Sequence, residues 1–425
     1  MGIAYRKKAG IMWTMIKRKI YSKLQNHLKD PEITMLIGSR QAGKTTLMEL
    51  LRSSLQVRGE ETASFNLERE EDMPFFKSQM ALVEKLKLNF GEKTGYVFID
   101  EIQRLENAGL FLKGIYDRNL PYKFVVTGSG SLELKEKIHE SLAGRKRMFE
   151  ISTLSLEEFV NYKTNYQYEG RLKDFFSVET QLANNLLKEY LLWGGYPRVV
   201  LAQKESDKIA TLDDIYDSYL EKDIKQLLGV IKGEGFTKLL MILADQIGKV
   251  VNVSEISSTL GIDRETTKKY LWFLKKTFVI EEIRPFYRNL RKELTKRSVY
   301  YFNDLGMRNY ILNRLDQTNL EIDGGFLFQN LVYYYLKEIT TAGVFKVNYW
   351  RTLDGAEVDF VVNSGSGPWP IEVKYSNLKK IKISRSMNSF IDAYQPKKMT
   401  IVNLSLNKVE KIDDIQFEAR TLSEL

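Results

Sequence analysis

The apolar residues near the start of the chain follow a helical period. Trp13, Ile16, Ile20, Leu24 and Leu28 recur every three or four positions among basic residues. This spacing places apolar side chains on one face of a helix, so residues 13–29 are predicted to form an amphipathic helix. The residues before it fit no element.

The pattern then changes to short apolar runs that are typical of buried strands. These runs are residues 33–37, 63–67, 96–99 and 124–127, with helical stretches between them. Strands that alternate with helices predict a parallel sheet covered by helices on both faces. We therefore expect an N-terminal helix within residues 1–30 and an α/β core at residues 31–155.

The remaining part of the chain divides into three further predicted regions. Strand signals are absent from residues 156–234, which predicts a helical linker or lid, broken at the sequence GGYP. Residues 235–298 carry a compact set of short helices. In residues 299–425 a helix is expected near 326–339, and strand signals return at 299–302, 346–351, 357–362, 370–374 and 398–404. A second α/β domain is expected there.

Composition limits the chemistry open to this chain. Cysteine is absent and the only histidines are His27 and His139, which excludes disulfides, thiolate zinc sites and a cysteine nucleophile and argues against a histidine-based metal cluster. No apolar run approaches the roughly 20 residues that span a bilayer, so a cytoplasmic protein without a membrane partner is expected. The net charge of +9 permits an acidic partner such as nucleic acid. Carboxylates, lysines, arginines, hydroxyls and bound phosphates remain for catalysis.

A glycine-rich loop after the first predicted strand matches G-x-x-x-x-G-K-[ST] in full. The predicted nucleotide-binding residues are Gly38, Ser39, Arg40, Gln41, Ala42, Gly43, Lys44, Thr45 and Thr46. Glycines let such a loop wrap closely, so that backbone N–H groups and the next helix N-terminus face phosphates. Lys44 is predicted to reach the β- and γ-phosphates of ATP, and the Thr45 hydroxyl to bind Mg²⁺. The alternative is a chance glycine loop on an α/β fold.

Paired carboxylates end the predicted strand at residues 96–99. Asp100 and Glu101 follow it directly, which places both at the carboxyl edge of the sheet, where ligands bind in such folds. Asp100 is predicted to hold the Mg²⁺ shell. Glu101 is predicted to orient and polarise the attacking water. Acidic residues also commonly begin loops, which is the alternative.

Two further catalytic positions are suggested by the next segments. Thr127 and Ser129 end another strand and are candidates to contact the γ-phosphate or its water. Arg145 is the candidate for a guanidinium supplied to the γ-phosphate, in cis or from a neighbouring chain, with Arg147 in reserve. The alternatives are an ordinary strand-to-loop turn and a solvated basic turn.

Residues 253–271 have the spacing of a helix-turn-helix. A short helix precedes a Leu-Gly-Ile turn, and a second helix begins at about residue 263. Residues 278–287 suit a β wing. The predicted DNA contacts on the second helix are Arg264, Thr267, Lys268 and Lys275. A protein–protein or purely architectural role is the alternative.

The last region carries a carboxylate–lysine motif. Asp359 lies on one predicted strand, and alternation along the next places Glu372 and Lys374 on one face. Two carboxylates can hold a second divalent ion, Mg²⁺ or Mn²⁺, while the lysine steadies the attacking water. Residues that merely hold strands together could give the same pattern.

Several motifs taken together resemble one family of AAA+-related ATPases of archaea and bacteria. They are the phosphate loop, the acidic and polar-ended strands, SLAGR at 141–145 with its continuation at 149–159, GGYP at 194–197 and YFNDLG at 301–306. Members of this family join an AAA-type ATPase to a C-terminal domain long described as of unknown function. The resemblance covers about residues 15–405. It implies an ATPase with an additional strand and a catalytic glutamate, a helical linker, a winged helix and a nuclease-like end, and it implies a homo-oligomer such as a ring.

The last region also resembles the PD-(D/E)xK nuclease superfamily, including the helix before the motif. Active members usually place an acidic residue on that helix, where this chain has Gln329. An amide oxygen is a poorer ligand for a hard cation than a carboxylate. We therefore expect cleavage to be weak or absent, and a nuclease fold retained without activity is the alternative.

These features together predict an α/β P-loop ATPase with a helical linker, a winged helix-turn-helix and a C-terminal α/β nuclease-like domain. Its cofactors are expected to be ATP and Mg²⁺, and its activity to be coupled to DNA binding or processing. Two rival hypotheses stay open. One is a nucleotide-gated protein-interaction switch without DNA chemistry, and the other is a nuclease whose phosphate loop only regulates assembly.

Overall fold

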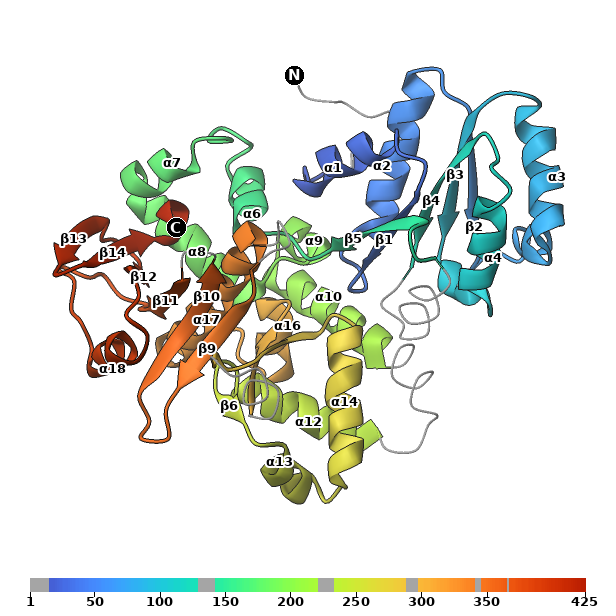
Figure 1. The fold of residues 1–425 in the computed structure, drawn as a ribbon. Helices are drawn as coiled ribbons and strands as arrows, with labels where there is room; N and C mark the ends of the chain where they lie inside the picture. Colours follow the sequence, from blue (N-terminus) through green and yellow to red (C-terminus); the bar gives the residue numbers. More distant parts are fainter. Residues whose placement is uncertain (1–14, 129–141, 221–232, 288–296, 341–344, 365–366) are drawn as a thin grey trace.

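The structure is a computed structural model that describes residues 15–128, 142–220, 233–287, 297–340, 345–364 and 367–425. One lobe carries a parallel sheet built from the first third of the chain (Figure 1). A second sheet, built from the last third, lies at the other end of the molecule, and the helices from the middle of the chain lie between the two.

The first sheet is parallel throughout and has the order β2-β3-β4-β1-β5. Its strands are β1 (Ile33–Gly38), β2 (Thr62–Asn66), β3 (Gly95–Asp100), β4 (Tyr122–Thr127) and β5 (Lys146–Ile151). As expected for a sheet covered on both faces, every residue of β1 is buried. Alternate side chains enter different cores: Met35 packs on one face and Leu36 on the other.

Helices cover both faces of this sheet. They are α1 (Ile20–His27), α2 (Lys44–Val57), α3 (Gln79–Phe90) and α4 (Ala108–Tyr116), with the 3-10 turns η1 (Met73–Phe76) and η2 (Ile102–Arg104). The first helix is shorter than the predicted 13–29, because residues 15–18 are not helical. Ile16 instead packs into the large core of the middle of the chain, whereas Leu24 of α1 packs under the first sheet. The apolar residues that share this helical spacing are therefore divided between two hydrophobic cores.

The position of β4 has a functional consequence. It lies between β1, which leads into the glycine loop, and β3, which ends in Asp100. The additional strand implied by the family resemblance is therefore present. Parallel strands bring their carboxyl ends to one edge of the sheet, so the three candidate segments converge there.

The helical region predicted after residue 156 is observed. It consists of α6 (Leu156–Lys163), α7 (Leu172–Val178), α8 (Thr180–Trp193), α9 (Pro197–Leu201) and α10 (Glu205–Ser218). A capping box starts α6, in which the Ser155 hydroxyl accepts from the Glu158 N–H while the Glu158 carboxylate accepts from the Ser155 N–H. The sequence GGYP interrupts the helical structure between α8 and α9.

A small antiparallel sheet and three helices follow. The elements are α12 (Gly233–Asp245), β6 (Val250–Val251), α13 (Val253–Leu260), α14 (Arg264–Lys276), β7 (Ile280–Ile283) and β8 (Ser298–Phe302). The turn between α13 and α14 contains Gly261 at φ +62°, and Asp263 caps α14 by accepting from the Thr266 N–H. The sequence predicts that the strand at 299–302 belongs to the last domain. It pairs instead with β6 and β7, so the proposed boundary after residue 298 cuts through a paired strand.

The last sheet is mixed and has the order β13-β14-β12-β11-β10-β9. The elements of this region are α16 (Leu305–Ile311), α17 (Gln317–Thr340), β9 (Val347–Arg351), β10 (Glu357–Ser364), β11 (Gly367–Val373), α18 (Arg385–Tyr394), β12 (Lys398–Asn403), β13 (Lys408–Ile412), β14 (Ile415–Thr421) and η4 (Leu422–Glu424). The four strands expected within it are observed, whereas α16, α18, β13 and β14 are not among the predicted elements. One hydrophobic cluster runs from α8 through α12 and β8 to α17 and β11, so these regions share a core.

No helix among the described residues is both long and apolar enough to cross a membrane.

Candidate functional site

The glycine loop begins where β1 leaves the sheet. Gly38 has a φ of +148°, and a Cβ atom there would lie 2.0 Å from the Ile151 carbonyl oxygen of β5. Gly43, at φ +98°, turns the chain into α2. Any side chain at Gly38 would therefore push β1 and β5 apart, which explains a glycine at the start of the loop.

The lysine of the loop folds back over the loop itself. Lys44 is buried, and its ammonium donates to the carbonyl oxygens of Gly38, at 3.1 Å, and Ser39, at 2.8 Å. The first N–H groups of α2 have no acceptor within the helix, because an α-helix leaves its first turn unpaired. A buried cation and a helix N-terminus thus converge on one loop, an arrangement that suits phosphate groups.

A carboxylate and two hydroxyls meet beside this loop. Asp100 is buried at the end of β3, and its Oδ1 accepts hydrogen bonds from Thr127, at the end of β4, and from Thr45 of α2, at 3.3 Å. Carboxylate and hydroxyl oxygens are ligands that Mg²⁺ prefers in proteins. The three residues fit a magnesium site. Thr127 also holds the Asp100 carboxylate by its hydrogen bond and lies beside β1, which leads into the glycine loop.

Glu101 adopts a left-handed backbone conformation, with φ +58°. Its N–H donates to the Thr127 hydroxyl at 3.2 Å, and its carboxylate accepts from the Gln103 amide. Burial raises the pKa of Glu101, and the neighbouring Asp100 raises it further. Left-handed backbone at a non-glycine residue costs energy and often marks a functional site. Here it directs Glu101 away from the path of β3.

Arg145 lies at the far end of the sheet from the glycine loop. Its carbonyl accepts from the N–H of Ile33, the first residue of β1, at 2.9 Å, and its Nε lies 2.6 Å from Oδ1 of Asp117. A strand as long as β1 spans about 20 Å. Arg145 therefore does not reach the loop of its own chain, which leaves either a role in trans or the alternative of a structural basic turn paired with Asp117. Ser129 lies outside the described residues, and Arg147 is exposed on β5.

Three residues that support the loop were not found from the sequence. Arg18 is nearly buried and donates to the Ala42 carbonyl at 2.9 Å and to Glu158 at 3.2 Å. Tyr196 hydrogen-bonds to Ser39, and burial raises its pKa. Arg198 donates to the Gln41 side chain at 2.9 Å.

All three come from segments far from the loop in sequence, so no local spacing connects them. Only the GGYP break, which ends next to Arg198, marked the region as unusual.

The predicted DNA contacts on α14 do not all face outward. Arg264 and Lys268 are exposed. The prediction for Thr267 is wrong, because this side chain has no exposed surface and its hydroxyl hydrogen-bonds to the Ser257 hydroxyl at 2.9 Å and the Asp263 carbonyl at 3.1 Å. Thr267 joins α14 to α13.

Lys275 is also engaged within the protein. Its ammonium lies 2.5 Å from the Glu282 carboxylate of β7, which accepts a second hydrogen bond from Ser298 of β8. The charge of Lys275 is thus largely balanced. The exposed basic side chains of α14 lie in its N-terminal half, at Arg264, Lys268 and Lys269, and of these Lys268 pairs with the exposed Glu265 at 2.7 Å.

The four C-terminal candidates meet at one place. Asp359 on β10 accepts from the Gln329 amide of α17 at 2.8 Å and from the Val373 N–H at 2.7 Å. Lys374 donates to Glu372 at 2.8 Å. Burial and the nearby Glu372 carboxylate raise the pKa of Asp359 well above its usual range.

The donor set fits a divalent ion only in part. Oε2 of Glu372 is buried without a hydrogen-bond partner, as expected for an atom that awaits a cation. Both carboxylate oxygens of Asp359 already accept hydrogen bonds, one from the Gln329 amide and the other from the Val373 N–H. Within the described part of the chain, no third acidic or histidine side chain joins these two carboxylates to complete a ligand set.

Three segments of the chain match family models. Residues 30–160 match a family model described as an AAA domain. Residues 184–318 and 324–422 match two models described as domains of unknown function.

Two relatives that match over most of their length carry names that describe them only as uncharacterised proteins. The chain is 27% identical to a protein of Mycobacterium tuberculosis over 91% of this chain and 79% of that one. It is also 27% identical to a protein of Haemophilus influenzae, over 85% of this chain and 87% of the other. A solved structure of the replication initiator DnaA bound to AMPPCP and single-stranded DNA has 15% identity, covers 62% of this chain and 90% of its own, and gives a TM-score of 0.26, too low to inform fold or function. The sheet order, the glycine loop and the family match together identify residues 30–160 as an AAA domain with the P-loop NTPase fold.

Proposed function

We propose that this chain is a cytoplasmic, Mg²⁺-dependent ATPase that couples its nucleotide state to DNA binding. The observation that carries the proposal is the meeting of Lys44, Thr45, Asp100 and Glu101 at one edge of the first sheet. These groups supply a phosphate cradle, magnesium ligands and a carboxylate for the attacking water, which are the parts that phosphoryl transfer requires.

Each residue has a separate task in this proposal. The carbonyl oxygens of Gly38 and Ser39 hold Lys44 in place, and phosphate oxygens would replace them as stronger, charged acceptors. Bound Mg²⁺ would neutralise charge on the β- and γ-phosphates. Glu101, whose raised pKa makes it a stronger base, would orient the water.

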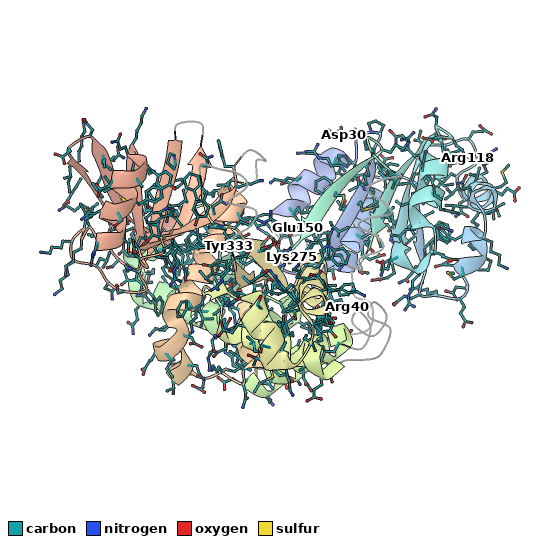
Figure 2. The ribbon with its side chains drawn as sticks, turned by 60° about the horizontal axis from the view of Figure 1, so that its bottom comes forward. Asp30, Arg40, Arg118, Glu150, Lys275 and Tyr333 are labelled. Carbon is teal, nitrogen blue, oxygen red and sulfur yellow. The ribbon has the colours of Figure 1, made fainter. Side chains whose placement is uncertain are left out.

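Two contacts support coupling between the ATPase lobe and the small sheet. Phe278, just after α14 and at φ +60°, is buried within the core of the first sheet. Lys337 of α17 donates to Glu150 of β5 at 3.2 Å and to Glu281 of β7 at 2.8 Å. Glu150 lies where the first lobe meets the rest of the molecule (Figure 2). A movement of the first sheet on nucleotide binding would therefore change the position of α14 through these contacts.

We infer that residues 233–302 act as a winged helix. Three helices with a three-stranded antiparallel sheet of order β6-β8-β7 support this, as does the close packing of α13 against α14 through Ser257 and Thr267. In such modules the second helix of the pair enters the major groove. Arg264 and Lys268 would be among its phosphate contacts.

Charge reversal of both Arg264 and Lys268 is expected to weaken DNA binding and to flatten its salt dependence. Each lost phosphate contact removes about 0.9 from the slope of log K against log salt, so a change of about 2 is expected. Titration of a labelled duplex at several salt concentrations measures it. ATP turnover without DNA should stay unchanged, because both residues are remote from the glycine loop.

The double variant Arg58→Glu/Lys87→Glu is the matched control. It changes the net charge equally at two exposed positions of the first lobe. If both double variants change the slope of log K against log salt by the same amount, the loss of DNA binding comes from net charge alone. If neither changes DNA binding, α14 is not the DNA-binding element, and the alternative of a nucleotide-gated protein-interaction switch is favoured.

We further infer that the C-terminal region is nuclease-like but poorly active. The succession α17, β9, β10, β11, α18 and β12, with Asp359 and Glu372 on adjacent strands, supports the PD-(D/E)xK resemblance. Gln329 weakens the metal site of this region. Its amide donates to Asp359 at the position where active members of that superfamily would present an acidic ligand.

Replacing Gln329 by Glu is expected to raise Mn²⁺-dependent cleavage of DNA at least about tenfold, because a third carboxylate would face the cation. Cleavage of plasmid and single-stranded DNA, measured with Mn²⁺ and with Mg²⁺, tests this. The triple variant Gln329→Glu/Glu372→Ala/Lys374→Ala should lose the gain while ATP turnover persists. Strong wild-type cleavage that survives Glu372→Ala/Lys374→Ala would place the metal site elsewhere.

A further inference from the structure

A histidine and two carboxylates meet at the amino-terminal edge of the first sheet, away from the nucleotide site. His27 ends α1, and Asp30 and Glu32 lie in the turn that leads into β1. Nε2 of His27 is 3.8 Å from Oδ2 of Asp30 and 3.9 Å from Oε2 of Glu32. One potential ligand atom from each residue lies within 4.8 Å of the others.

The imidazole nitrogen that faces the carboxylates lacks a hydrogen bond. His27 is only 3% exposed, and its Nε2 is buried with no partner. Its other nitrogen, Nδ1, lies 2.7 Å from the hydroxyl of Thr34, which is fully buried on β1. If Nδ1 donates to Thr34, Nε2 keeps a lone pair directed at the carboxylates, the arrangement by which a hydrogen bond at one ring nitrogen orients a metal-binding histidine.

Lys123 holds the turn that carries the two carboxylates. Its ammonium donates to the backbone carbonyls of Asp30, at 2.8 Å, and of Glu32. The carboxylate side chains themselves are 48% and 38% exposed, so they are free to shift while the backbone stays fixed. Lys123 and Arg147 both act on the imidazole as cations, so the two carboxylates are offset by two positive charges in the absence of a metal ion.

We propose that His27, Asp30 and Glu32 bind a divalent transition-metal ion, with Zn²⁺ the best match. Zinc bonds to imidazole nitrogen and carboxylate oxygen are about 2.0–2.2 Å long, so tetrahedral ligands lie about 3.4 Å apart. Small movements of the two exposed side chains close the present gaps. Water would complete the shell from the solvent side.

One histidine suffices for this site because carboxylates supply the other ligands. With two histidines in its sequence, the chain is unsuited to a cluster of several histidines but can still form a mixed histidine–carboxylate site. Imidazole with carboxylate suits zinc better than Mg²⁺, which prefers oxygen ligands alone.

The site is separate from the proposed ATP site. Asp30 precedes β1 and Arg40 follows it, and the two lie at opposite ends of the sheet (Figure 2). A bound ion would tie the end of α1 to the start of β1. Ile33 there is hydrogen-bonded to Arg145, so the ion would also steady the edge that carries this arginine.

Calorimetric titration of the metal-free full-length chain with Zn²⁺, in millimolar Mg²⁺ and without nucleotide, tests the proposal. The wild type is expected to bind at this site with a rise in melting temperature. The double variant Asp30→Asn/Glu32→Gln should bind at least about 100-fold more weakly. Both side chains are partly exposed, so this variant is expected to keep its fold, which circular dichroism checks.

Matched variants separate this site from other metal ligands. Asp359→Asn/Glu372→Gln removes the other carboxylate pair, and His139→Asn removes the other histidine. Both are expected to leave zinc binding intact, whereas His27→Gln should remove it along with the visible absorption of a Co²⁺-loaded chain. The proposal is overturned if Asp30→Asn/Glu32→Gln binds zinc as tightly as the wild type, or if only the control variants lose it.

Discussion

Glutamine in place of Glu101 is expected to lower ATP turnover by about 10²- to 10⁴-fold while ATP binding persists. The substitution keeps the size of the side chain and its contact with Gln103, but removes the negative charge that would polarise the attacking water. The phosphate cradle at Lys44 is untouched, so affinity for nucleotide should be close to that of the wild type. Binding of a fluorescent ATP analogue and release of phosphate, measured on the same samples, give the two quantities.

Lys44→Ala is the contrasting variant. Because Lys44 is the buried cation of the loop, its removal should weaken nucleotide binding and turnover together. Turnover by Glu101→Gln at the wild-type rate would show that another group positions the water. Equal loss of nucleotide binding in both variants would instead mean that Glu101 acts by holding the loop.

Arg145→Ala is expected to reduce turnover by about 10³-fold or more, through a site on the neighbouring chain. Arg145 lies at the amino-terminal edge of the sheet and pairs with Asp117, so it cannot serve its own glycine loop. At the surface of a homo-oligomer it would face the γ-phosphate of the next subunit. Turnover of the wild type should accordingly rise faster than linearly with protein concentration.

Mixing inactive variants tests whether the arginine acts in trans. Arg145→Ala chains keep an intact phosphate loop, and Lys44→Ala chains keep Arg145, so a mixture should regain turnover that neither shows alone. Arg147→Ala, at an exposed position on the adjoining strand, is the control and should stay active. An inactive mixture would mean that Arg145 is needed within its own chain, and an active Arg145→Ala combined with an inactive Arg147→Ala would assign the role to Arg147. An active Arg145→Ala would remove the arginine from the reaction.

Local chemistry made parts of this protein predictable. Lys44 and Thr45 follow Gly43 directly, so one short motif specifies both the turn and the groups that meet phosphate. Asp100 and Glu101 end a strand whose apolar run is itself the signal for burial. Both features can be predicted without knowledge of which residues pack against them.

Apolar periodicity was less reliable where two cores compete for one segment. Ile16 and Leu24 share a helical spacing, yet only the second lies on α1, because Ile16 is buried in the core formed by the later helices. The strand at 299–302 shows the same difficulty. Its sequence identifies a buried strand but not its neighbours, and it pairs with β6 and β7 rather than with the last sheet.

The phosphate loop, the acidic strand and the carboxylates of the last region could be predicted, because each is encoded in consecutive or alternating positions. Tertiary packing, in contrast, sets the direction in which Thr267 faces, pairs Lys275 with Glu282 and places Arg145 at the edge of the sheet far from its own loop. It also brought Arg18 and Arg198 to the glycine loop. These features depend on contacts between packed elements, which no short stretch of sequence specifies.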